Sequence, residues 1–450
     1  MVRPPALESW GPVHYDVIRS QAALGVPIVR FHQASLANGL EVVAELNDRA
    51  YSVATGFFVK TGSRDETAEI AGLSHFLEHM VFKGTERRDA LAVNRDFDRV
   101  GAKHNAQTSE EDTIYHATCL PEYLPATFEV LADILRPSLR ADDFETEKQV
   151  IIEEIKMYQD NPMMVAYDTS KEVHFDQHPL GRSILGTVES IRALEPGPMR
   201  AYFERRYSPA NIVLAVTGKA DWDAVVALAE KHCGAWKGGP APRETVAPRG
   251  TCRFQAILRE EDQQQTVVMV ADGPPLESDD RHAARLLTMV LGDATGSRLY
   301  WELIDPGHAD GVELSYQDYN NGGAFYTFLS CGPESTSENL RRVAGVYRRL
   351  MADGPTEEEL DRARNKVLAR LVIASERPMG RLMGLGYHWA YRREYHSVER
   401  ELEIYRAVTT ADLRRVLERW PLLPMTIVSV GPTTEVTPPA FWSSPQGELS

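Results

Sequence analysis

The second half of this 450-residue chain repeats the order of sequence patterns found in its first half. Residues 193–218 predict a helix, a turn, a buried strand and a closing glycine, and residues 407–431 predict the same order. The segments 148–162 and 365–378 also correspond, and all these matches lie 213–217 residues apart. Two copies at one offset indicate a duplication and not a solenoid. We therefore expect an α+β fold of two homologous domains, each an antiparallel-rich sheet with helices.

A stretch rich in proline and glycine separates the two copies. It opens with Gly238-Gly239-Pro240-Ala241-Pro242 and runs to about Gly250, and such composition is typical of a domain boundary. We predict an N-terminal domain at residues 1–237, a linker at 238–251, a C-terminal domain at 252–437 and a loose tail at 438–450. Within the first copy, the patterns predict strands at 40–44, 53–60, 113–119 and 211–217, and helices at 71–82, 124–135, 142–158 and 199–207.

Charge and cysteine usage exclude several classes of protein. The formal net charge of -16 argues against nucleic-acid binding, which needs a basic face. The four cysteines are far apart and form no CxxC pair, so we expect neither a disulfide framework nor a cysteine zinc site. The N-terminus lacks the apolar run of a signal peptide, and no stretch has the roughly 20 apolar residues of a membrane span. We expect a cytoplasmic protein, or a periplasmic one if the N-terminus has been trimmed.

The segment His75-Phe76-Leu77-Glu78-His79 has the pattern HxxEH, the inverted order of the commoner HExxH. On a helix, residues i, i+3 and i+4 share one face, so both imidazoles point the same way. Two imidazoles suit a zinc ion, and Glu78 beside them is placed to act as the general base. The alternative is a solvated helix with incidental histidines.

A catalytic zinc needs a third protein ligand, and the helix at 145–158 offers several glutamates. Glu153 falls on the solvated face, whereas Glu147 and Glu154 fall on a stripe that we expect to face the core. The stripe consists of Glu147, Val150, Ile151, Glu154 and Tyr158. Carboxylates on an apolar stripe are costly unless something satisfies them. A metal ion would satisfy Glu154, and Glu147 would orient a ligand by a hydrogen bond. The alternative is that both glutamates form structural ion pairs.

The residues around this motif resemble a known family. Residues 72–85, GLSHFLEHMVFKGT, are similar to the pitrilysin/insulinase family (M16) of zinc peptidases, closest to its mitochondrial-processing-peptidase-like bacterial branch (M16B). Residues 101–108, GAKHNAQT, resemble the family's substrate-strand segment, and residues 147–154 resemble its glutamate helix, which puts the third zinc ligand on Glu154. The segments HPLG at 178–181 and YSPAN at 207–211 also match. The resemblance covers most of residues 35–220 and thins beyond the linker.

The resemblance implies half of a clamshell around a closed chamber, in which unfolded peptides are hydrolysed. It implies one Zn²⁺ per chain, held by His75, His79 and Glu154. It also implies that Asn105 and Ala106 lie on an edge strand that accepts the substrate by β-addition. The second half lacks the metal set, since the duplication places Ala284, Leu287 and Thr288 opposite the HxxEH residues and Arg370 opposite Glu154.

The proposed activity is that of a zinc metalloendopeptidase, in which Glu78 takes a proton from a zinc-activated water and no acyl-enzyme forms. One alternative is a non-catalytic peptide-holding or structural subunit of the same fold. Another is a zinc enzyme that acts on a non-peptide substrate.

The resemblance also bears on the partner. In the family, an Arg and a Tyr seven positions later in a C-terminal domain contact the substrate and its carbonyl oxygen. After Ser297-Arg298-Leu299-Tyr300, the corresponding positions are Ile304 and Gly311, and the nearest tyrosine is Tyr316. We therefore predict a heterodimer whose homologous partner supplies the Arg/Tyr pair, with a homodimer as the alternative.

Overall fold

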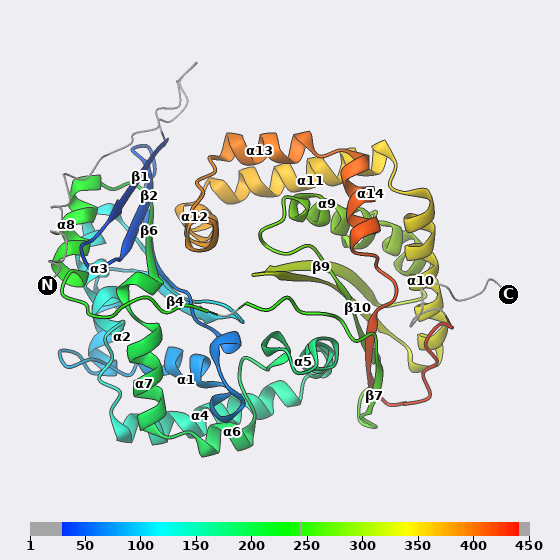
Figure 1. The fold of residues 1–450 in the computed structure, drawn as a ribbon, viewed down its shortest axis with the longest axis horizontal. Helices are drawn as coiled ribbons and strands as arrows, with labels where there is room; N and C mark the ends of the chain where they lie inside the picture. The colour runs from blue at the N-terminus through cyan, green and yellow to red at the C-terminus, as the bar shows by residue number, and fades with distance from the viewer. Residues whose placement is uncertain (1–28, 244, 441–450) are drawn as a thin grey trace, which may run out of the picture.

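The structure, a computed structural model, describes residues 29–243 and 245–440, and its strands form two separate sheets (Figure 1). The first sheet has the order β1-β2-β6-β3-β5-β4, and the second has the order β7-β11-β8-β10-β9. The strands are β1 (Val29–Ser35), β2 (Glu41–Asn47), β3 (Val53–Val59), β4 (Lys103–Thr108), β5 (Thr113–Cys119), β6 (Ile212–Gly218), β7 (Phe254–Leu258), β8 (Gln265–Asp272), β9 (Gly311–Tyr319), β10 (Gly322–Cys331) and β11 (Thr426–Gly431).

The two sheets have the same topology. The β2–β6 pair of the first sheet and the β7–β11 pair of the second are parallel, and the remaining pairings in both sheets are antiparallel. Aligning β2 with β7 therefore aligns the sheets strand by strand, with β1 added at one edge of the first. This confirms the predicted α+β fold of two similar halves.

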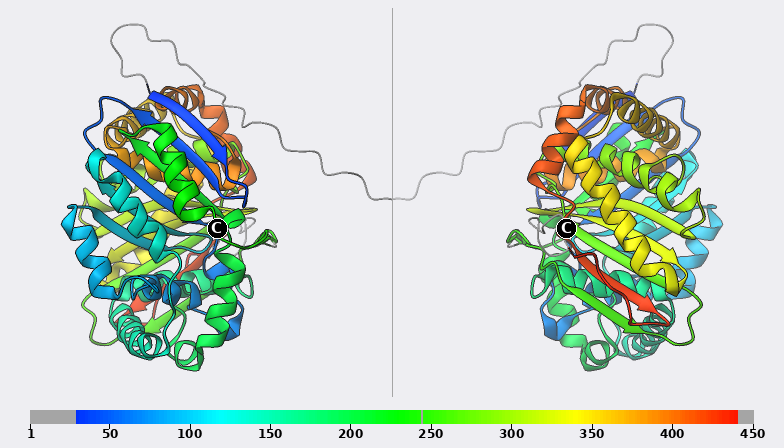
Figure 2. Two further views of the ribbon diagram at one scale, coloured as in Figure 1. Left: turned by 90° about the vertical axis from the view of Figure 1, so that its left-hand side faces the viewer. Right: turned by 90° about the vertical axis from the view of Figure 1, so that its right-hand side faces the viewer.

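Helices cover both sheets (Figures 1 and 2). In the first half they are α1 (Leu73–Val81), α2 (Ala90–Arg99), α3 (Leu124–Ile134), α4 (Ala141–Gln159), α5 (Pro162–Phe175), α6 (Val188–Ala193), α7 (Pro196–Arg206) and α8 (Trp222–Cys233). In the second half they are α9 (Asp280–Gly292), α10 (Thr336–Asp353), α11 (Glu357–Ser375), α12 (Pro378–Arg392), α13 (Val398–Ala407) and α14 (Thr410–Arg419). The strands and helices predicted in the first copy are all present, with ends shifted by up to three residues.

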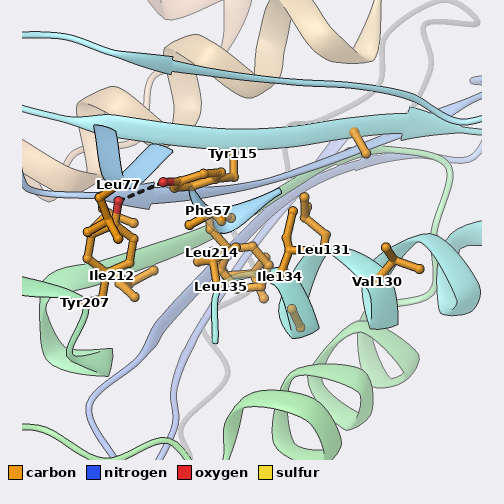
Figure 3. Packing of buried hydrophobic residues seen from close by; sticks show 14 of the residues in the cluster. Phe57, Leu77, Tyr115, Val130, Leu131, Ile134, Leu135, Tyr207, Ile212 and Leu214 are labelled. Carbon is orange, nitrogen blue, oxygen red and sulfur yellow. Dashed lines mark hydrogen bonds between the residues drawn. The ribbon is translucent and has the colours of Figure 1, made fainter. Parts of the chain in front are cut away.

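The largest core lies between the first sheet and its own helices. Phe57 and Leu214 from the strands meet Leu77 of α1 and Leu131 of α3, and all four side chains are fully buried (Figure 3). Burial of such large apolar side chains stabilises the fold by about 1.5–3 kcal/mol each. Within this core the hydroxyls of Tyr115 and Tyr207 lie 2.8 Å apart and form a hydrogen bond. The packing fixes α1 against the sheet, and α1 carries the HxxEH motif.

The opposite face of each sheet is covered by a helix from the other half. Helix α12 packs on β2, β3 and β6, where Leu382 joins a cluster with Phe58. Helix α5 packs on β8 and β11, where Phe175 joins a cluster with Val268. Both helices begin with proline, at Pro162 and Pro378, which are corresponding positions of the duplication. The sequence analysis did not foresee this exchange, because apolar periodicity identifies a buried face but not the sheet that buries it.

The segment between the halves crosses the surface of the first half. The described residues from 238 to 253 form neither helix nor strand. Within this segment, the Arg243 guanidinium donates to the carboxylates of Asp65 and Glu111. Residues 1–28 of the predicted first domain, and all but three residues of the predicted tail, lie outside the described residues.

Two further sequence predictions concern cysteines and membranes. All four cysteines are free, as expected, and Cys252 is the most exposed of them. Among the described helices, none is long and apolar enough to cross a membrane.

Candidate metal centre

Helix α1 begins at a sharp turn that only glycine accommodates. Gly72, which precedes the helix, has φ +90°, and a Cβ there would lie 2.5 Å from the Leu185 carbonyl oxygen. The buried Glu66 carboxylate accepts hydrogen bonds from the backbone N–H groups of Gly72 and Ser74, at 2.8 and 2.6 Å. These bonds satisfy the free donors at the helix start, and a negative charge there is favourable. The direction of α1, and so of His75, is fixed from its first turn.

The apolar face of α1 is buried, and its polar face meets helix α4. Leu73, Phe76, Leu77 and Met80 are all buried, as the helical spacing predicts. Phe76 stacks on Phe144 of α4 with ring centroids 4.5 Å apart. This contact sets the rotation of the two helices about their axes, so that the polar residues of α1 and α4 face each other.

Three predicted ligands converge between α1 and α4. Nε2 of His75 lies 3.9 Å from Oε1 of Glu154, and Nε2 of His79 lies 3.5 Å from Oε2 of Glu154. One ligand atom from each of these residues lies within 4.8 Å of the others, and no other histidine, cysteine or acidic group in the described chain converges in this way. Ligands held tetrahedrally at about 2.0–2.1 Å from a zinc ion lie roughly 3.3 Å from one another, so the donor set fits zinc with small adjustments.

The two imidazoles have different surroundings. Burial, with a smaller contribution from the charge of His79, lowers the pKa of His75 to about 3, so His75 is neutral, as a metal ligand must be. Burial also disfavours the charged form of His79, but its hydrogen bond to the Glu147 carboxylate and the negative charges of Glu147, Glu154 and Glu78 together outweigh burial and raise the pKa. The distance from Nδ1 of His79 to Oε1 of Glu147 is 2.8 Å. Since Glu147 occupies Nδ1, the other nitrogen of His79 is directed to the ligand cluster.

Glu147 is the innermost carboxylate of the site, with its side chain only 4% exposed. Burial would raise its pKa, but the hydrogen bonds with His79 and Lys83 hold the pKa below its usual value. The Lys83 ammonium forms an ion pair with the second carboxylate oxygen. Lys83 therefore neutralises a charge that would otherwise be buried beside the histidines.

Glu78 lies beside the ligand cluster and is mostly buried. Burial raises the pKa of its carboxyl group, and a hydrogen bond from Thr108 acts in the opposite direction. The Thr108 hydroxyl donates to Oε2 of Glu78 at 2.6 Å. Thr108 is the last residue of β4, the strand at the free edge of the first sheet.

Asn105 and Ala106, the predicted substrate-binding residues, lie in the middle of β4. The strand pairs with β5 on one side, and the structure places no strand of the described chain on its other side. The Asn105 side chain is exposed, whereas Ala106 packs against the core on the same face as Thr108. The structure thus brings the edge strand beside α1, next to Glu78.

The predicted stripe on α4 was only partly right. Glu147 and Ile151 are buried, but Val150 is 47% exposed, and Glu154 and Tyr158 are partly exposed. The buried face is rotated toward Phe144, Lys148, Ile152 and Ile155. The predicted stripe therefore lies along the border of the buried face and not at its centre. Glu153 is exposed and pairs with Lys156, as expected for the solvated face.

Lys83 and Thr108 are residues of the site that the sequence analysis missed. Both lie inside segments that it singled out, at 72–85 and 101–108. Lys83 lies beyond the end of α1 at Val81 and pairs with Glu147 of α4, so the helical spacing of the motif does not point to it. No local spacing links Thr108 to Glu78, because they lie 30 residues apart.

In the second half, the positions opposite the ligands hold no metal set. Ala284 and Leu287 are fully buried apolar residues of α9, and Thr288 donates its hydroxyl to the Arg285 carbonyl oxygen. Arg370 of α11 forms an ion pair with Asp293 at 2.6 Å.

Known proteins resemble this chain over most of its length. The family model described as Insulinase (Peptidase family M16) matches residues 41–188, and that of the Peptidase M16 inactive domain matches residues 194–367. An uncharacterized zinc protease of Mycobacterium tuberculosis is 33% identical over 394 residues, which cover 85% of this chain and 89% of the relative. The uncharacterized zinc protease YmxG of Bacillus subtilis is 29% identical over 382 residues, which cover 84% of this chain and 92% of the relative.

Solved structures share the fold. A protease from Helicobacter pylori superposes with a TM-score of 0.84 at 21% identity, over 90% of this chain and all of the other. A peptidase M16 inactive domain from Pseudomonas fluorescens also gives 0.84 at 21% identity, over 91% of this chain and 99% of the other. The two family models divide the chain near residue 190, before the stretch that the sequence analysis expects to be the linker.

Proposed function

Because this chain belongs to the insulinase family, peptidase family M16, we propose that it is a zinc metalloendopeptidase that hydrolyses unfolded peptides. The observation that carries the proposal is the convergence of His75, His79 and Glu154 beside Glu78. His75 and His79 lie on α1 and Glu154 lies on α4, so only the packing of these two helices brings the three side chains together. Buried polar groups are costly unless they are satisfied, and a metal ion satisfies all three ligands at once.

The donor set favours zinc. Two imidazoles, one carboxylate and an open fourth position are typical of catalytic zinc sites. His75 is neutral and His79 is oriented by Glu147, so both imidazoles can offer a lone pair. When bound, zinc would polarise the scissile carbonyl and lower the pKa of a water toward about 7. One zinc per chain is proposed because Ala284, Leu287, Thr288 and Arg370, at the corresponding positions of the second half, do not form a metal-binding set.

The chain's own residues supply the remaining chemistry. Glu78 accepts the proton of the attacking water and passes it to the leaving amine, which is a role for a carboxylate of raised pKa. The free edge of β4 offers the backbone groups of Asn105 and Ala106 to an extended peptide. Main-chain pairing does not depend on side chains, so it suits a peptidase with broad substrates. The substrate must be unfolded, because the backbone groups of a folded protein are already paired and cannot pair with β4.

The partner is a further part of the proposal. We infer that a homologous subunit completes a closed chamber and supplies an Arg/Tyr pair that this chain lacks. Ile304 and Gly311 occupy the expected positions. Tyr316 is a poor substitute, since its hydroxyl donates to the Pro274 carbonyl oxygen at 2.6 Å. The isolated chain should then cleave peptides weakly and gain activity when a homologue is co-expressed. Robust turnover by the isolated chain would favour the homodimer.

The experiment that tests the peptidase assignment combines metal content with cleavage of a quenched peptide. The purified protein, alone and with co-expressed homologue, is expected to bind one zinc and to cleave the peptide, and chelation should stop the cleavage. Glu78→Gln should keep zinc and the fold but lower the rate by about 10²–10⁴-fold. Cleavage by this variant at the wild-type rate would remove Glu78 as the base.

The second candidate is a non-catalytic subunit of the same fold. A specific observation favours keeping it: the family model that matches residues 194–367 is described as the Peptidase M16 inactive domain. A non-catalytic subunit would show no rate difference between the wild type and Glu78→Gln, with or without a partner. A zinc-dependent rate that is lost in the variant excludes it.

A further inference from the structure

We propose that Thr108 is a positioning residue that fixes the Glu78 carboxylate relative to the edge strand β4. The inference rests on the proposed peptidase function, in which Glu78 is the base and β4 receives the substrate. It assigns a role to a residue that is not part of the metal ligand set.

The contact is short and specific. The Thr108 hydroxyl donates to Oε2 of Glu78 at 2.6 Å, a length typical of a hydroxyl bonded to a charged carboxylate. Within the described residues, no other hydrogen bond or ion pair of the Glu78 side chain is found. A glutamate has three side-chain torsions, and holding one oxygen removes most of that freedom. The other oxygen, Oε1, is left for proton transfer.

The alternation of β4 directs Thr108 toward α1. Exposure alternates along the strand: Lys103, Asn105 and Gln107 are exposed, and the residues between them are partly buried. On the more buried face, His104 stacks on Phe97 of α2 at 4.0 Å and Ala106 packs on the core. Thr108 shares this face because side chains two and four residues apart lie on the same side of a strand.

The backbone at Thr108 is held on its paired side. Thr108 lies opposite Thr113 in the β4–β5 register, and the Thr113 hydroxyl donates to the Thr61 carbonyl oxygen at 2.9 Å. The next residue, Ser109, accepts a hydrogen bond at its carbonyl oxygen from the Ser63 N–H, at 3.3 Å. The hydroxyl of Thr108 is therefore a fixed point to which a flexible carboxylate is attached.

This arrangement joins two parts of the proposed reaction. A peptide that pairs with the free edge of β4 takes its position from that strand, and the base takes its position from the same strand through Thr108. The distance from the base to the peptide is then set by one rigid element, which is how preorganised sites avoid misplacement of about 1 Å. Without the hydroxyl, the peptide and zinc should bind as before, but the carboxylate would sample unproductive positions.

The test compares Thr108→Val with Thr108→Ser in the full-length protein. Valine keeps the branched shape and removes only the hydroxyl, while serine keeps the hydroxyl. We expect Thr108→Val to lower kcat by about 10–100-fold, the factor that a hydrogen bond to a charged group is worth, with KM and zinc content unchanged. Thr108→Ser should stay near the wild-type kcat. Thr118→Val on β5 is the matched control, because the Thr118 hydroxyl has no hydrogen-bond partner among the described residues.

Crystal structures of the wild type and of Thr108→Val provide a readout independent of activity. The Glu78 carboxylate should leave its wild-type position in the valine variant. A wild-type kcat for Thr108→Val, or a loss confined to KM or to zinc binding, would overturn the positioning role. If the wild type itself cleaves no peptide, the proposed function fails, and the position of Glu78 in the two crystal structures alone decides whether Thr108 fixes it.

Discussion

The two halves of the chain place the same pair of helices against each other, but they fill the contact differently. In the first half, α1 and α4 meet through His75, His79 and Glu154. In the second half, α9 and α11 pack in the same way, and the α9 positions opposite the HxxEH residues include the fully buried Ala284 and Leu287. The pairing of these helices therefore does not depend on a metal. The second half shows that this contact can be largely apolar, whereas the first half holds polar side chains at the same place.

The polar side chains between α1 and α4 are by themselves unfavourable for stability. An apolar helix contact gains from burial, whereas the first half holds three carboxylates and two imidazoles in partly desolvated positions. Two polar contacts offset part of the cost, since Lys83 pairs with Glu147 and Thr108 bonds to Glu78. Four comparisons of variants test this difference between the halves.

Removing a ligand should weaken the zinc binding that we propose for the first half. Glu154→Gln should lower zinc affinity by more than the roughly 10–100-fold that Glu147→Gln costs, because Glu147 acts through His79. Glu153→Gln, one residue away and exposed, is the control and should bind zinc like the wild type. Zinc titration with a competing chelator measures all three variants. Equal losses at 153 and 154 would mean that the ligand is misassigned.

Exchanging the corresponding residues should show which half tolerates a carboxylate. Leu287→Glu should lower the free energy of unfolding by about 3–5 kcal/mol, because it buries a charge without a partner. Glu78→Leu should leave that free energy unchanged or raise it, since a partly desolvated carboxylate is removed. Urea unfolding of the two variants and the wild type gives the comparison. A similar loss in both would show that Glu78 contributes to stability and that the halves are alike in this respect.

Helix α12, which belongs to the second half but covers the first sheet, contains two glycines with different surroundings. A Cβ at Gly386 would lie 2.1 Å from the Phe58 ring, whereas a Cβ at Gly384 would have no neighbour within 4 Å. Gly386→Ala should cost about 1–3 kcal/mol by overpacking the contact with the first sheet. Gly384→Ala should gain about 0.5–1 kcal/mol from better helix propensity. Urea midpoints measure both, and a tolerated Gly386→Ala would contradict the close approach of α12.

The second half has a buried histidine without a metal role, and it should make stability depend on pH. Burial, with the neighbouring charges of Arg281 and Arg285, lowers the pKa of His282 to about 2. Between pH 6.5 and pH 2 the unfolded chain binds a proton that the folded chain excludes, so stability is full above pH 6.5 and is lost as the pH falls. His282→Phe should reduce the loss between pH 7 and pH 5 by roughly 2 kcal/mol. Unfolding of both proteins at each pH measures this difference, and parallel curves would contradict it.

Much of the fold and of the candidate site could be predicted because the signals are local. The strands at 53–60 and 113–119 and the helix at 142–158 were predicted within a few residues, and the duplication predicted two halves of one topology. The prediction that Val150 faces the core was wrong, because helical periodicity gives the direction of a buried face but not its width. The exchange of α5 and α12 was not predicted, since either sheet could bury the same apolar face.

Local spacing accounts for one part of the candidate metal centre, and packing accounts for the rest. Spacing of three and four residues places His75, Glu78 and His79 on one face of any α-helix, whatever surrounds it. The convergence of Glu154 with them, and the contact from Thr108 to Glu78, exist only because α4 and β4 pack against α1. The physical reason is that helix geometry relates near neighbours in the chain, while packing of apolar faces relates distant ones and leaves no spacing to read.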